Sequence, residues 1–217
     1  MSIVAVAGCG STGRDRAGTV ERPDPVSPVH QNQGGTLSAE QARAALLTVM
    51  DLPTGWSAKP DTGAAKKDSS DDYQECPKLA AVFKKADSAD DISAGFTSPS
   101  DSDLSEAILP MTLSAAESLV AEFSDVVTTC KRLSSNTDDG MPFDMYMTAL
   151  SFPKLADETF AFRTTATLMG ATVNADMVLV RRSGVLCFIV HTARGRIDTA
   201  ATEDVAQRAF AKIEKGL

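Results

Sequence analysis

The segment VLVRRSGVLCFIV, residues 178–190, decides the fold of this chain. It consists of two apolar runs on either side of the connection from Arg181 to Gly184. Ser183 and Gly184 are short enough to form a two-residue hairpin turn, so the two runs are predicted to pair as antiparallel strands. Near the turn both faces of these strands are apolar, which is expected of central strands that are covered on both sides. The segment therefore predicts the middle of a sheet.

Four further extended runs accompany this hairpin. Together with its two strands, at 171–182 and 185–192, their apolar residues predict strands at 92–98, 104–113, 143–152 and 158–168. Met169 and Gly170 can connect two of these runs by another short turn. The chain is thus expected to form a mostly antiparallel sheet of about six strands.

The sequence also predicts helices packed on this sheet. A capping box of Ser38 and Gln41 starts a helix that is expected to run to about Met50. A short helix follows Cys76, a second capping box at Ser114 and Glu117 starts a long one, and the last is expected at about 200–214. The side chains expected to face the core are Ala42, Ala45, Leu46 and Val49; Leu79, Val82 and Phe83; Ala116, Leu119, Val120, Phe123, Val127 and Cys130; and Val205, Ala206, Ala209, Phe210 and Ile213. This pattern defines the α+β class and one domain at 37–217.

The N-terminal stretch AVAGCGSTGRD, residues 5–15, has two interpretations. Gly8 to Gly13 match G-x-G-x-x-G, a pattern of dinucleotide-binding loops, but the prolines at 23, 25 and 28 leave no room for the required helix and second strand. Val6 to Cys9 also resemble a bacterial lipobox, in which the cysteine is lipidated. We therefore expect a truncated signal peptide with a lipobox at 1–9, with the true start codon upstream, and a disordered tether at 10–36.

The negative charge of the chain limits the kinds of partner that it can bind. The formal net charge is −8 and the sequence pI is about 4.8, and no basic patch with interleaved aromatic residues is present. Nucleic acid is therefore not an expected partner. No apolar stretch reaches the roughly 20 residues of a membrane span. The protein is expected to be extracytoplasmic and to meet the cell membrane only through a lipid on Cys9.

Three cysteines remain once Cys9 is set aside: Cys76, Cys130 and Cys187. They allow three single pairings, and outside the cytoplasm one pair is expected to oxidise. A bridge between Cys76 and Cys130 is favoured because it would join two predicted helices, and closing that loop would stabilise the fold by about 4 kcal/mol in the chain-entropy model. Cys187 lies within a strand and is expected to be a buried thiol.

Catalytic and metal-binding groups are not expected. His30 lies in the predicted tether, and His191 follows Cys187 by four strand residues, a separation of about 13 Å that excludes a shared zinc or a hydrogen-bonded dyad. The carboxylates cluster in polar turns without an EF-hand pattern, and no G-x-S-x-G elbow is present. We expect no enzyme activity, no metal and no cofactor, and a hydrogen-bonded ring for His191.

The predicted strands carry apolar residues at alternate positions, including Met145, Met147 and Phe162. These side chains form either an adaptable surface for an apolar ligand or an ordinary core beneath the helices. Tyr146 and Arg163 could supply polar contacts at a cleft. The candidate ligand-binding residues are therefore Met145, Tyr146, Met147, Phe162 and Arg163.

Several phrases of the sequence resemble a known family. They are AALLTVMDLPTGWS (44–57), ESLVAEFSDVVTTC (117–130), ETFAFR (158–163), DMVLVRRSGVLCFIV (176–190) and the C-terminal helix. They look like actinobacterial lipoproteins that carry a PknH-like extracellular sensor domain, and the resemblance covers most of 37–217. It implies an antiparallel sheet with helices around a cleft for an unknown ligand. Family members often have two disulfides, whereas this chain can form only one after lipidation.

These observations predict a lipid-anchored binding or sensor domain without catalytic activity. Its ligand would be a small molecule, a lipid or an envelope protein. Two alternatives are a lipid carrier with an apolar cavity and a structural envelope protein without a small ligand.

Overall fold

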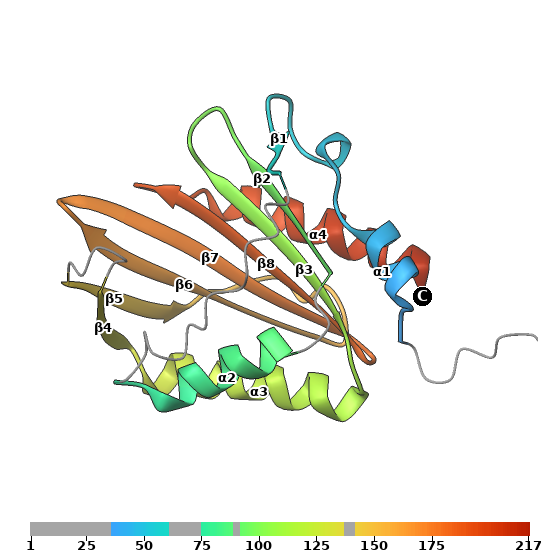
Figure 1. The fold of residues 1–217 in the computed structure, drawn as a ribbon, viewed down its shortest axis with the longest axis horizontal. Coiled ribbons are helices and arrows are strands. Elements are labelled where there is room, and N and C mark those ends of the chain that lie inside the picture. The colour runs from blue at the N-terminus through green and yellow to red at the C-terminus, as the bar shows by residue number, and fades with distance from the viewer. Residues whose placement is uncertain (1–35, 61–74, 89–91, 137–141) are drawn as a thin grey trace, which may run out of the picture. The chain divides into compact units, whose positions relative to one another are not determined.

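The hairpin at 178–190 lies in the middle of one eight-stranded sheet in which all neighbouring strands are antiparallel. The computed structural model describes residues 36–60, 75–88, 92–136 and 142–217. The strand order is β1-β2-β3-β8-β7-β6-β5-β4 (Figure 1). The strands are β1 (Ser57–Ala58), β2 (Ile92–Thr97), β3 (Asp103–Pro110), β4 (Arg132–Asn136), β5 (Pro142–Ala149), β6 (Glu158–Leu168), β7 (Ala171–Arg182) and β8 (Val185–Arg194).

Helices cover both faces of this sheet. They are α1 (Ala39–Ala45), α2 (Pro77–Ser88), α3 (Leu113–Thr129), α4 (Thr199–Gly216) and the 3-10 turn η1 (Val49–Asp51). Figure 1 shows α2 and α3 together on one side of the sheet and α1 and α4 on the other. The α+β class and the antiparallel sheet are therefore as expected from the sequence.

Two short turns fix the register of the central strands. Arg182 pairs with Val185, which leaves Ser183 and Gly184 as the turn, and Ser183 has a φ of 51°. A Cβ on Gly184 would lie 2.4 Å from the carbonyl oxygen of Met111, so this position requires glycine. The β6–β7 turn has the same length and places Met169 and Gly170 at positive φ.

The alternation of side chains along the central strands separates two hydrophobic cores. Leu179 and Leu186 pack against the α2–α3 side with Phe123 of α3, whereas Val178 and Ile189 face the α1–α4 side with Phe210 of α4. Both sets are almost fully buried. The prediction that β7 and β8 are covered on both faces near their turn is confirmed.

A disulfide joins the two helices of the α2–α3 side. Cys76, just before α2, is bonded to Cys130, the C-cap of α3, with 6.2 Å between their Cα atoms. This is the pairing that the sequence favours. Cys187 is free and buried, as predicted.

The sheet has eight strands, so the expected number of about six was too small. The two additional strands, β1 and β4, are the edge strands of the sheet. β1 has only two residues, and β4 has the mostly polar sequence RLSSN. Neither has the apolar alternation from which a strand can be predicted.

The first helix is also shorter than expected. It ends at Ala45, and residues up to Met50 continue as a loop and then as η1, because Asp51 accepts hydrogen bonds from Thr48. Val49 is consequently exposed instead of facing the core. The capping box of Ser38 and Gln41 and the inward residues predicted for the last helix are confirmed.

The long helix α3 begins two residues earlier than its predicted capping box. Thr112 is the N-cap and accepts a hydrogen bond from the Ala115 amide, so the interpretation of Ser114 as the cap was wrong.

The N-terminal predictions lie outside the described residues. They are the signal peptide and lipobox at 1–9, with Cys9, and the tether at 10–36, of which only Thr36 is described.

Candidate functional site

Among the described residues, helices cover only part of one face of the sheet. On the α1–α4 side these helices pack against β2, β3, β7 and β8. The same face of β4 and β5 carries exposed side chains, including Arg132, Tyr146 and Thr148. We define the open polar face as the neighbouring residues Arg132, Ser134, Asp144, Tyr146, Thr165 and Thr167. Tyr146 is 49% exposed although it lies within a strand of the sheet.

The strand register brings these residues together. Arg132, Tyr146 and Thr165 lie opposite one another on β4, β5 and β6, and Ser134 lies opposite Asp144. A hollow of about 490 Å³ opens here and is lined by Ser134, Asp144, Tyr146 and Thr167 together with Pro142 and Phe143. This volume is within the range of small-molecule sites, about 300–1,000 Å³.

The carboxylate of Asp144 is held in place in this hollow. It accepts a hydrogen bond from Arg132 Nη2 at 2.9 Å and another from Ser134 Oγ at 2.9 Å. The bond from Arg132 lowers the pKa of Asp144, so this group stays ionised and presents acceptor oxygens.

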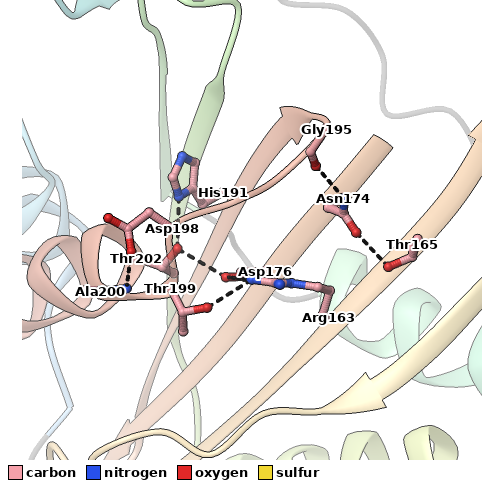
Figure 2. A network of polar contacts seen from close by, with 10 residues as sticks. All are labelled: Arg163, Thr165, Asn174, Asp176, His191, Gly195, Asp198, Thr199, Ala200 and Thr202. Carbon is pink, nitrogen blue, oxygen red and sulfur yellow. Dashed lines mark hydrogen bonds and ion pairs between the residues drawn. The ribbon is translucent and has the colours of Figure 1, made fainter. Parts of the chain in front are cut away.

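A buried polar network borders the open polar face at the start of α4. Figure 2 shows Arg163 of β6 reaching Asp176 of β7 with two hydrogen bonds, at 2.5 and 2.8 Å. Arg163 also donates to Thr199 at 2.9 Å. Asp176 is fully buried, whereas the Arg163 side chain is 24% exposed. The bidentate pair joins β6 to β7, and the bond from Arg163 to Thr199 fixes the start of α4 against these strands.

The network continues to His191 through Thr202. The Thr202 hydroxyl donates to Asp176, and its oxygen lies 2.9 Å from His191 Nδ1 (Figure 2). Because the hydroxyl has a single proton, we assign Nδ1 as the donor to Thr202. Burial lowers the pKa of His191, so the ring is neutral near pH 7.

Asp176, Thr202 and His191 have a structural role, because their hydrogen bonds hold α4 on the sheet. Thr202 is fully buried, and its oxygen is occupied by both neighbours, so it is not placed to attack a substrate. The hydrogen-bonded ring expected for His191 is therefore present. Two residues before Asp176 on β7, Asn174 accepts a hydrogen bond from the Thr165 hydroxyl and donates to the Gly195 carbonyl, which ties Thr165 of the open polar face to β7 and the end of β8.

A second buried acid lies further along the same side of the sheet. Glu106 of β3 is fully buried and accepts a hydrogen bond from the Leu47 amide at 2.6 Å, while the Cys187 thiol lies 3.9 Å from its other oxygen. Burial raises the pKa of Glu106 to about 7; Lys212 partly offsets this effect, and Asp51 adds to it. Burial likewise raises the pKa of the Cys187 thiol, which makes it unreactive.

An apolar hollow of about 770 Å³ lies near Glu106. Its lining includes Leu47, Val49 and Met50 of the η1 region and Ala94 and Phe96 of β2. Met50 is 91% exposed at its rim. This apolar hollow is distinct from the open polar face, because it lies at the opposite edge of the sheet.

The five residues predicted to bind a ligand do not form one site. Met147 and Phe162 are buried on the α2–α3 side, and Met145 packs partly against the same core, so these three belong to the ordinary core that was the alternative interpretation. Tyr146 and Arg163 point to the opposite face. Only Tyr146 is substantially exposed, because Arg163 is bound to Asp176.

Sequence reasoning missed the polar partners of these residues. Asp144 and Asp176 were not singled out, since single carboxylates in strands have no spacing that predicts their neighbours. Glu106 was grouped with the carboxylates of polar turns, and that interpretation was wrong, because Glu106 is fully buried within β3. The sequence did contain a signal for Asp176: it lies within a strand predicted to be covered, where a carboxylate needs a buried partner. Among the described residues, no group of three or more His, Cys, Asp or Glu side chains could hold a metal ion.

Within the described ranges, no helix is both long and apolar enough to span a bilayer.

The fold defines a class of domain: one antiparallel sheet with a helix pair on each face. Among solved structures, the extracellular domain of PknH from Mycobacterium tuberculosis is similar, with a TM-score of 0.57, 14% identity, and coverage of 83% of this chain and 98% of that chain. A putative uncharacterized protein from Mycobacterium smegmatis, the Rv0999 ortholog, aligns with a TM-score of 0.43 and 12% identity over 80% of this chain and 96% of that chain. No protein-family model and no curated protein matches the sequence. This chain therefore has a PknH-like fold at low sequence identity.

Proposed function

We propose that this protein is a non-catalytic ligand-binding domain that works outside the cytoplasm and is attached to the membrane by a lipid on Cys9. The observation that carries the proposal is the fold shared with an extracellular domain over most of both chains. The Cys76–Cys130 disulfide supports it, because such bonds persist in oxidising compartments. The lipobox-like Val6 to Cys9 supports the mode of attachment.

The open polar face is the surface that we assign to ligand binding. It combines a hollow, an exposed aromatic ring and fixed hydrogen-bonding groups, which together are typical of binding sites. The neighbouring network of Arg163, Asp176 and Thr202 would keep the underlying strands in one position. No step of this function requires a reacting side chain.

Attachment is tested by expressing the gene with its upstream codons and separating membrane from soluble fractions. The wild-type chain is expected in the membrane fraction and accessible to protease added to intact cells. Cys9→Ala is expected in the soluble extracytoplasmic fraction, while Cys187→Ala, a matched control that also removes a cysteine, stays with the membrane. Equal membrane binding of Cys9→Ala and wild type would contradict the lipid anchor. Protein that folds with free thiols at Cys76 and Cys130 in the cell would contradict the location.

The apolar hollow favours a second candidate function, the carriage of a lipid. Its volume is sufficient for part of an acyl chain, and its lining is largely apolar. Native mass spectrometry distinguishes the two functions. A carrier would retain a co-purifying lipid that is lost in Phe96→Ser, whereas a binding domain with its site on the open polar face would be recovered without one.

A further inference from the structure

The open polar face carries mostly short polar side chains and one tyrosine. Of its six residues, four are Ser, Asp or Thr, one is Tyr and one is Arg, and none is Lys or Glu. Short side chains and tyrosine lose little conformational freedom when they are ordered by a ligand. This composition lowers the entropic cost of binding and is typical of recognition surfaces.

The positive charges of this face are already paired. Arg132 is paired with Asp144 at 2.9 Å, the neighbouring Arg163 is paired with Asp176, and the Glu75 carboxylate, which accepts a hydrogen bond from the Ser134 amide at 2.8 Å, adds a negative charge at the edge. In the described part of the face, no unpaired positive charge is therefore left to attract a phosphate, a nucleotide or an anionic headgroup. The surface instead suits a ligand that is itself neutral and polar.

The remaining groups offer mainly hydrogen-bond acceptors. The Thr165 hydroxyl gives its proton to Asn174 Oδ1 at 2.6 Å and can still accept, the Thr167 hydroxyl can donate and accept, and the fixed carboxylate of Asp144 accepts. Such a mixture matches a ligand with several hydroxyl groups. It does not match an acyl chain, which would leave these groups without partners.

The ring of Tyr146 supplies the apolar contact that such a ligand needs. It is about half exposed and borders the hollow that Asp144 and Thr167 also line. A sugar ring has an apolar face of C–H groups that can stack on an aromatic ring, while its hydroxyls lie at the edge. On the protein, the Tyr146 ring lies beside fixed polar groups, so it can contact the apolar face of a sugar while those groups bond its hydroxyls.

We propose that the open polar face binds a neutral oligosaccharide, with one sugar ring on Tyr146 and its hydroxyls bonded to Asp144 and Thr167. This inference rests on the proposed binding function and gives it a ligand class. Binding is one-sided and shallow, because the hollow lies on a sheet surface. The surface can therefore bind a sugar within a longer polymer and does not require the end of the polymer chain.

The test uses the full chain and soluble oligosaccharides. Neutral glucan, mannan, galactan and arabinan oligomers are titrated in separate experiments, with anionic alginate oligomers and lauric acid as contrasting probes, and amide shifts are followed by NMR. At least one neutral oligomer is expected to shift the signals of Tyr146 and Thr165. Tyr146→Ala is expected to weaken that binding by about tenfold or more, whereas Tyr146→Phe keeps most of it. Met50→Ala, a control that truncates an exposed apolar residue at the opposite edge of the sheet, leaves it unchanged.

Several results would overturn the inference. These are the failure of every neutral oligomer to shift the signals of this face, stronger binding of alginate, or a loss of binding in Met50→Ala. If lauric acid alone binds, at the apolar hollow, the sugar assignment fails and the lipid-carrier function is favoured over binding at the open polar face. A failure of extracytoplasmic attachment would appear instead in the Cys9 fractionation, which does not depend on sugar. Circular dichroism of each variant separates lost binding from lost folding.

Discussion

The two faces of the sheet are made by the same strands but have different interiors. On the α2–α3 side, Phe123 packs against Phe83, Phe162 and Phe188, and a disulfide fastens the helix pair. On the α1–α4 side, the sheet buries Glu106, Asp176 and His191. Apolar packing and a covalent bond stabilise the first face. The second face also contains fixed polar contacts: Arg163 and Asp176 hold the start of α4 beside the open polar face, and Glu106 holds Leu47, which follows α1, near the opposite edge of the sheet.

The largest expected effect is on the α2–α3 side. Replacing both Cys76 and Cys130 with serine removes the constraint on a long loop and should lower the free energy of unfolding by about 4 kcal/mol. Denaturant unfolding under non-reducing conditions measures this difference. Wild-type protein treated with a reductant should show the same loss. A mapped bond between Cys130 and Cys187, or equal stability before and after reduction, would contradict the assigned role of this side.

A smaller effect is expected on the α1–α4 side and depends on pH. The pKa of Glu106 is about 7 in the folded chain and 4.5 as its ordinary value, so the folded state binds this proton more tightly. The stabilisation from Glu106 is complete below pH 4.5 and is lost as the pH rises through 7. Its size is roughly 3 kcal/mol.

The variant Glu106→Gln removes this titration. The free energy of unfolding, measured from pH 5 to pH 8, should fall for wild type relative to Glu106→Gln as the pH rises. The exposed control Glu40→Gln should follow the wild-type curve. Parallel curves for wild type and Glu106→Gln would show that burial of Glu106 has no energetic consequence.

The smallest of these effects compares the buried network with the open polar face. Asp176→Asn removes the charge partner of Arg163 and should cost about 2 kcal/mol, a moderate value because Arg163 retains some contact with water. Asp144→Asn, in an exposed pair, should leave the unfolding free energy nearly unchanged. Thermal unfolding of the two variants side by side checks this. A larger loss for Asp144→Asn would reverse the assignment of structural and binding roles.

The sequence was sufficient to predict the centre of the molecule, because that centre follows from local patterns. The apolar runs around Ser183 and Gly184 specify a covered hairpin, and the inward stripe of the last helix follows from its 3.6-residue period. Edge strand β4 was missed because its residues are mostly polar and its pairing with β5 is imposed by tertiary structure.

The candidate site was predicted less well than the fold. Tyr146 was identified, but it was grouped with Met147 and Phe162, which lie on the opposite face. The contacts that define the site join residues of different strands, such as Arg132 with Asp144 and Arg163 with Asp176. Such contacts depend on strand register, which sequence spacing does not determine.

We infer that the part of the sheet face that the described helices leave uncovered is the binding surface. Amide hydrogen exchange of the full chain with and without a saturating neutral oligosaccharide tests it most directly. Slower exchange is expected in β5 and β6 around Tyr146 and Thr165, with no change around Leu47 to Met50. Slower exchange around Leu47 to Met50, with none around Tyr146, would contradict it.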